Sequence, residues 1–105
     1  TQCRGLARRA TTGLAWVGGI GGNGSGDIFI AFSTGNSVRQ GEAVSDVKML
    51  APERMTNLFQ AAAEATEEAI LNAMCAAQTM TGREGRVIHA LPHDLLVKAM
   101  TDYRR

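Results

Sequence analysis

The sequence has few aromatic residues, and this scarcity limits the core that it can form. Only 5% of the 105 residues are aromatic, while alanine and 12 glycines make up much of the small apolar content. Small side chains bury little area each, and burial of apolar area stabilises a fold by roughly 25 cal/mol per Å². The core is therefore expected to be thin for a chain of this length, and a layer from a partner is expected to complete it.

Cysteine is also scarce, and no pattern of ligands indicates a metal. The two cysteines, Cys3 and Cys75, cannot form a disulfide framework, and neither C-x-x-C nor H-x-x-H spacing occurs. Cys75 stands among Met74 and two alanines, where a small buried thiol is expected. Neither a metal nor another cofactor is expected.

The chain has no excess of either charge and no long apolar run. Its 11 basic and 10 acidic residues give a net charge of +1, so nucleic acid and acidic membrane surfaces are not expected as partners. No stretch approaches the roughly 20 apolar residues of a membrane span. Residues 2–5 lead into a basic helix rather than into the apolar core of a signal peptide. These features favour a cytoplasmic location.

A first helix is predicted near the start of the chain. Apolar residues recur at steps of three and four from Leu6 to Val17, which predicts a helix over residues 2–17. Gly5 and Gly13 within it cost about 1 kcal/mol each relative to alanine. Such a cost is more easily tolerated where another backbone packs close to the glycine.

The second half of the chain is predicted to be mainly helical. A long helix begins at Pro52, and Gly82 is expected to stop it. Residues 86–90 form a short extended segment, and a last helix runs over residues 93–103 with its apolar side facing inward. A second strand is predicted around residues 43–49.

The best predicted strand covers residues 27–34, directly after a glycine-rich loop. Side chains alternate along a strand, so one face carries Asp27, Phe29 and Ala31, and the other carries Ile28, Ile30 and Phe32. Both faces are apolar beyond Asp27, which is typical of a strand covered on two sides. The order of elements predicts an α/β fold, with residues 1–105 as a single piece.

Ser25 and Asp27 are the candidate catalytic residues. They stand two positions apart where the strand begins, so a hydroxyl and a carboxylate are expected on the same side. Gly24 and Gly26 leave room for a substrate backbone and are the candidate substrate-binding residues. A Ser/Asp pair can relay a proton to or from a nucleophile, or hold a cationic amine. An ordinary serine or Asx turn leading into a strand is the alternative interpretation.

The glycine loop does not indicate a phosphate-binding site, and the histidines do not indicate a catalytic triad. The glycine loop follows a helix and precedes a strand, whereas a phosphate-binding loop has the reverse order. His89 and His93 are expected to be surface or capping residues, so no Ser-His-Asp triad is predicted.

Several runs resemble a known family over nearly the whole chain. That family is the L-aminopeptidase/D-alanine-esterase/amidases, which includes the β-peptidyl aminopeptidases. The matching runs are Arg8–Ala10, Gly13–Ala15, Gly22–Asp27, Ile30–Thr34, Ala65–Ile70, Thr79–Arg83 and His89–Pro92.

The resemblance implies an αββα sandwich of the N-terminal-nucleophile type and a self-processing precursor. Family members cut themselves before a serine, which becomes the nucleophile, and the two chains stay together in an oligomer of two-chain units. They remove N-terminal residues from short peptides, amides and esters. The family's second active-site serine falls on Ser25, and its nearby acidic residue falls on Asp27.

The resemblance also implies that this chain is the C-terminal part of the β chain. The strand that carries the nucleophile lies upstream of Thr1, so the chain alone is expected to be inactive and to pair with the rest of the precursor. One alternative makes Thr1 itself the N-terminal nucleophile, although such residues usually start a strand. A second alternative is a non-catalytic assembly module that packs against sister subunits.

Overall fold

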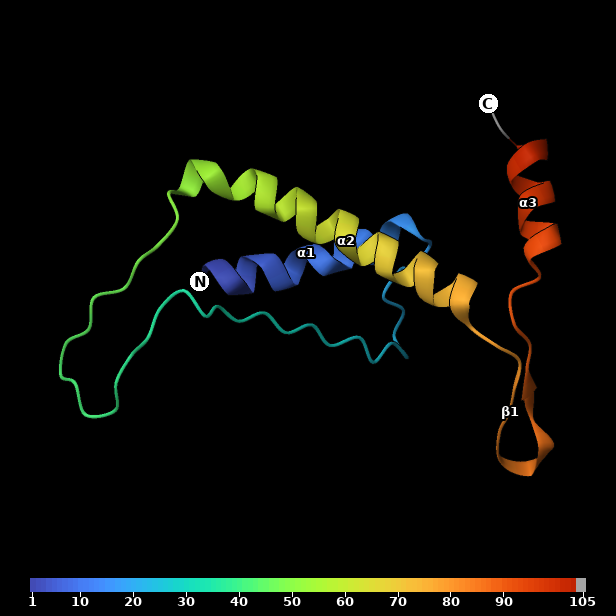
Figure 1. Cartoon of the computed structure of the whole chain (residues 1–105), viewed down its shortest axis with the longest axis horizontal. Coiled ribbons are helices and arrows are strands. Elements are labelled where there is room, and N and C mark those ends of the chain that lie inside the picture. Colours follow the sequence, from blue (N-terminus) through green and yellow to red (C-terminus); the bar gives the residue numbers. More distant parts are fainter. Residues whose placement is uncertain (104–105) are drawn as a thin grey trace. The chain divides into compact units, whose positions relative to one another are not determined.

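The computed structural model describes residues 1–103. It divides into two compact units, residues 1–67 and the residues from 68 on, and the division falls within the longest helix. Figure 1 shows the elements in chain order. They are α1 (Gln2–Trp16), η1 (Pro52–Arg54), α2 (Met55–Ala76), β1 (Met80–Thr81), η2 (Arg83–Gly85), β2 (Val87–Ile88) and α3 (His93–Asp102).

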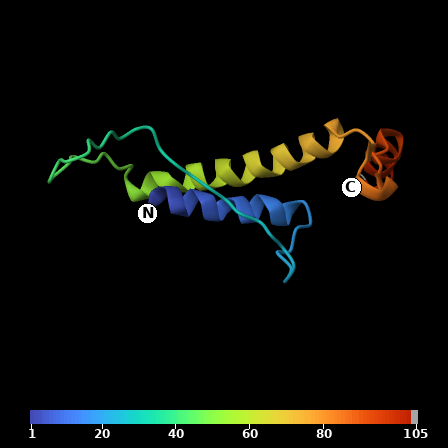
Figure 2. The ribbon, with the colours of Figure 1, turned by 90° about the horizontal axis from the view of Figure 1, so that it is seen from below.

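Helix α1 confirms the predicted first helix, and its glycines lie against α2. A Cβ added at Gly13 would lie 2.2 Å from the carbonyl oxygen of Ala63 and 2.7 Å from the Cβ of Thr66. A Cβ added at Gly5 would lie 3.1 Å from the ring of Phe59. The two helices run side by side in the same direction (Figures 1 and 2). Gly13 therefore lies where the backbone of α2 comes close to α1, whereas Gly5 faces a side chain of α2.

Gly13→Ala is expected to lower the free energy of unfolding by about 1–3 kcal/mol, although alanine is the better helix former. Its Cβ would overlap a backbone oxygen of α2, so the two helices would have to separate. Gly5→Ala is the matched control, because its Cβ would meet only a ring that can move. Denaturant unfolding compares the two variants. Equal losses of stability would contradict the close packing at Gly13.

Residues 27–34 form a second layer beside the helices. The two views agree that this extended segment lies across one face of the α1/α2 pair (Figures 1 and 2). Phe29 and Ala31 are partly buried, whereas Ile28, Ile30 and Phe32 are 91%, 87% and 81% exposed. The predicted alternation is present, but only one face is covered. The predicted strand itself is not formed, because no described segment pairs with residues 27–34, and the only sheet among residues 1–103 is β1–β2.

The expected thin core is confirmed. Met55, at 6% exposure, and Ala63, at 2%, are the only buried hydrophobic residues among residues 1–103. Most large apolar side chains of this part of the chain face solvent. Much apolar area therefore stays exposed, because no further layer among the described residues covers it.

The long helix begins as predicted and ends earlier than predicted. Pro52 opens the turn η1 and α2 follows, but α2 ends at Ala76 rather than at Gly82. The Nε2–H of His93 donates to the carbonyl oxygen of Cys75 over 2.9 Å, which satisfies a group in the last turn. His93 is thus a capping residue, as expected. Cys75 is exposed rather than buried, because no described element covers this end of α2.

A hairpin takes the place of the predicted end of that helix. β1 pairs antiparallel with β2, with Met80 opposite Ile88, and the backbone N–H of Ala90 donates to Thr79 Oγ1 over 3.0 Å. The extended segment predicted over residues 86–90 is therefore present. α3 confirms the last helix, but of its expected inward-facing residues only Leu96 is partly buried, and the others, among them Leu95, Met100 and Tyr103, are exposed.

Candidate active site

The glycine loop begins by closing the C-terminus of α1. The N–H of Gly18 donates to Ala15 O over 3.0 Å, and the N–H of Gly19 donates to Leu14 O over 2.9 Å. Gly18 has a φ of +92°, a conformation that glycine adopts without a steric penalty. The loop therefore leaves the helix by turning sharply at Gly18.

The loop then makes a tight turn that delivers Ser25. The N–H of Ser25 donates to Gly22 O over 2.8 Å, and the strand-like segment starts two residues later. The Oγ–H of Ser25 donates a hydrogen bond to Oδ2 of Asp27. The N–H of Asp27 points back to Ser25 Oγ, at 3.4 Å. The two side chains therefore lie on the same side of the chain, and both are exposed.

An open cavity of about 520 Å³ lies beside Asp27. Its other walls come from the last turns of α1 and from the glycine loop: Thr11, Leu14, Ala15, Gly18, Gly19, Ile20 and Gly21. The contribution of α1 was not predicted, because nothing in the local sequence indicates that the loop folds back toward the helix. A hydroxyl–carboxylate pair next to an open cavity can orient a hydroxyl nucleophile or hold a cation.

Gly24 and Gly26 flank Ser25, and both lie in open space. A Cβ added at either position would meet no atom within 4 Å. Contacts among the described residues therefore do not require glycine at these two positions. Their assignment to substrate binding stays a prediction.

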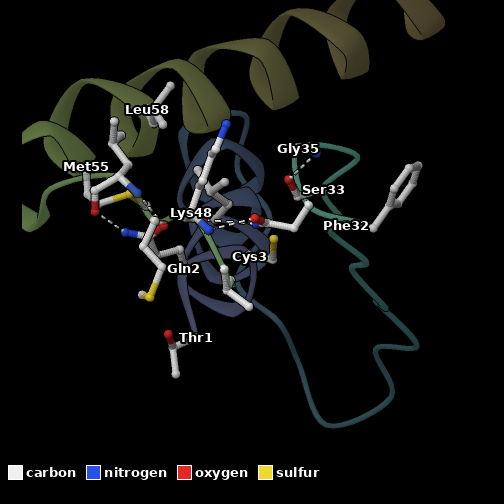
Figure 3. A pocket seen from close by; sticks show the side chains of 14 residues that line it. Thr1, Gln2, Cys3, Phe32, Ser33, Gly35, Lys48, Met55 and Leu58 are labelled. Carbon is white, nitrogen blue, oxygen red and sulfur yellow. Dashed lines mark hydrogen bonds between the residues drawn. The ribbon is translucent and has the colours of Figure 1, made fainter. Parts of the chain in front are cut away.

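Thr1 lies at the other end of α1. It precedes the first residue of that helix and lines a separate cavity of about 670 Å³ together with Cys3 and Leu6 (Figure 3). The 15 residues of α1 correspond to a helix length of about 22 Å at 1.5 Å per residue. Ser25 and Asp27 follow the far end of α1, so they are not placed to assist Thr1.

Within residues 1–103, no three metal-ligating side chains gather into one cluster. None of the helices described combines the length and hydropathy that a membrane crossing requires.

Comparison with known families identifies the chain. The model of peptidase family S58 matches residues 1–88. The chain belongs to peptidase family S58.

Curated members of the family agree with this assignment. The chain is 46% identical, over 106 aligned positions, to the β-peptidyl aminopeptidase BapA of Sphingosinicella microcystinivorans, covering 99% of this chain and 27% of that protein. It is 35% identical to BapA of Sphingosinicella xenopeptidilytica, covering 94% of this chain and 25% of that protein. The chain therefore spans about a quarter of the length of these relatives.

Solved structures of similar proteins share the arrangement of the S58 chain. The PH0078 protein of Pyrococcus horikoshii matches with a TM-score of 0.88 and 46% identity, over 95% of this chain and 29% of that one. The L-aminopeptidase D-Ala-esterase/amidase of Ochrobactrum anthropi, described as a variant of the Ntn hydrolase fold, matches with a TM-score of 0.85 and 40% identity, over 95% and 29%. The S58 chain is thus a partial α/β structure, and one of its structural neighbours is described as having a variant of the Ntn hydrolase fold.

Proposed function

We propose that this chain is the C-terminal part of the β chain of a self-processing serine aminopeptidase, here called the parent protein. The parent removes N-terminal residues from short peptides, amides or esters. The observation that carries the proposal is the hydrogen bond from Ser25 to Asp27 beside an open cavity. It occurs in an S58 chain whose curated relatives are β-peptidyl aminopeptidases.

The reaction is acyl transfer to an N-terminal serine located upstream of Thr1 in the parent, followed by hydrolysis. The serine oxygen forms a bond to the substrate carbonyl carbon, and the bond to the leaving amine, or to the alcohol of an ester, breaks with transfer of a proton to the leaving group. Water then attacks the acyl-enzyme and releases the serine. This chain contributes residues that position the nucleophile and not the nucleophile itself.

The direction of the Ser25–Asp27 hydrogen bond supports a positioning role. Ser25 gives its only proton to Asp27, so its oxygen can act toward other groups only as an acceptor. One acceptor site faces the Asp27 N–H, and the second is available to the hydroxyl of the nucleophile. Asp27 fixes this direction, and its negative charge also favours a nearby ammonium group, of the substrate or of the N-terminal serine.

The parent completes the αββα sandwich around this chain. The exposed Ile28, Ile30 and Phe32 form one continuous apolar strand face, which suits an apolar second sheet. That sheet comes from the rest of the precursor, namely the α chain and the strand that carries the nucleophile. Several two-chain units then assemble into an oligomer through further apolar surface.

A serine-directed covalent inhibitor tests the proposed nucleophile in the processed parent protein. Intact-mass analysis followed by peptide mapping is expected to find one adduct, on the N-terminal serine upstream of Thr1. The reason is that only that serine has a free amine beside its hydroxyl to act as a base. An adduct on Thr1 would overturn the assignment and favour Thr1 as the nucleophile. An adduct on Ser25 would show that Ser25 reacts directly and does not position another serine.

A further inference from the structure

Two side-chain amides hold the segment that precedes α2. The strand predicted around residues 43–49 is not formed: residues 43 and 44 are bends, and the segment itself, residues 45–50, contains no helix, strand, turn or bend. Asn36 Nδ2 donates to Lys48 O over 3.0 Å, and the N–H of Lys48 donates to Asn36 Oδ1 over 2.7 Å. Gln2 Nε2 donates to Leu50 O over 2.6 Å, and the N–H of Leu50 donates to Gln2 Oε1 over 3.2 Å. Figure 3 labels Gln2 and Lys48 among these residues.

Each amide stands where a peptide group of a neighbouring strand would stand. It offers one donor and one acceptor to a single residue, as a paired residue does in an antiparallel sheet. In an extended segment, the backbone groups of residues two apart point to the same edge. Lys48 and Leu50 therefore present one edge, and the two amides fill it.

The opposite edge of the segment has no partner among the described residues. Val47 and Met49 present their N–H and C=O groups there, and no group of residues 1–103 forms a hydrogen bond with them. Unpaired backbone groups in a sheet edge are a template for pairing with another strand. The segment thus has one edge that is filled at Lys48 and Leu50 and an opposite edge that is available for pairing.

The side chains of the segment fit an outer strand. Asp46, Lys48 and Leu50 share one face of the segment and Val47 and Met49 lie on the other, so the first face carries both charges and the second is apolar beyond Ser45. Val47 is 57% and Met49 is 65% exposed, which leaves apolar area to be covered. Strands of an antiparallel sheet commonly have one solvated face and one face that is covered by the core. Lysine is common in the edge strands of such sheets.

We propose that residues 45–50 form the outermost strand of a sheet in the parent protein. The Val47/Met49 edge pairs with a strand from the remainder of the parent, and the Asn36 and Gln2 amides close the outer edge against any further strand. The chain spans 27% of a curated relative, so the remainder has ample polypeptide to supply the partner strand. This inference rests on the proposed function only in taking the chain to work within a longer parent.

Amide hydrogen exchange in the intact parent protein, resolved to single residues, tests the proposal. The N–H of Met49 is expected to exchange at least about tenfold more slowly than its intrinsic rate, the effect of one additional net hydrogen bond. Asn36→Ala and Gln2→Ala are the matched variants, because they remove the acceptors for Lys48 and Leu50 only. They are expected to speed exchange at Lys48 and Leu50 and to leave Met49 protected.

The results of the exchange measurement distinguish a partner strand of the same parent from a second copy, and the outer-strand proposal from the proposed function. Exchange of the Met49 N–H at its intrinsic rate would overturn the outer-strand proposal. Protection that disappears on dilution would identify a second copy as the partner and would also overturn it. The exchange measurement needs no catalytic activity, so an inactive parent with a protected Met49 would contradict the proposed function and support the outer strand.

Discussion

Ser25→Ala in the parent protein is expected to lower kcat by about 10²–10⁴-fold, the usual contribution of one positioned proton-handling group. The substitution removes the oxygen that accepts from the nucleophile and deprives Asp27 of its hydrogen-bond donor. Asp27→Asn keeps the shape of the side chain and removes its charge, so it is expected to lower kcat by a similar factor. Hydrolysis of an amino acid p-nitroanilide by the already processed enzyme measures both effects.

The double variant and two controls make this prediction specific. Ser25 and Asp27 act as one unit, so the double variant should be about as slow as the slower single variant, because such effects are not additive. Ser37→Ala and Asp102→Asn remove an exposed hydroxyl and an exposed carboxylate elsewhere and should leave kcat unchanged. Wild-type rates in both site variants would mean that the loop is structural, and would favour the non-catalytic assembly module.

Ile30→Glu is expected to prevent correct assembly of the parent protein. Ile30 is 87% exposed in this chain, yet we propose that a second apolar sheet covers it in the parent. An unpaired carboxylate buried there would cost several kcal/mol, a large fraction of the stability of a typical domain. The variant is expected to accumulate as unprocessed, aggregated precursor, which denaturing gels and size-exclusion chromatography detect.

Val38→Glu is the matched control for that substitution. Val38 is also an exposed apolar residue, at 64%, but it lies in the loop after residues 27–34 and outside the strand face. It should process and assemble normally. If Ile30→Glu behaves like Val38→Glu, the face of Ile28, Ile30 and Phe32 is not covered in the parent.

The sequence predicted those features that depend on neighbouring residues. The periodicity from Leu6 to Val17 is local, and α1 follows it. The two-residue spacing of Ser25 and Asp27 is local too, and it brings their side chains together in the structure. The alternation along residues 27–34 also reappears in the burial of the side chains.

The features that were predicted wrongly or not at all depend on distant residues. The apolar stripe of α2 continues beyond Ala76 in the sequence, but the helix ends there, and His93 caps its last turn from 18 positions along the chain. The walls of the cavity at Asp27 depend on how the glycine loop lies against α1. No local pattern indicates what pairs with the backbone of residues 28–34, because no described segment forms a hydrogen bond with that backbone.

A crystal structure of the processed parent protein would give the distance between Ser25 Oγ and the hydroxyl oxygen of the N-terminal serine. We expect the two oxygens to lie within hydrogen-bonding reach, about 2.6–3.2 Å apart, or to be joined through one water molecule. An N-terminal serine on the opposite face of residues 27–34, away from Ser25 and Asp27, would contradict this expectation.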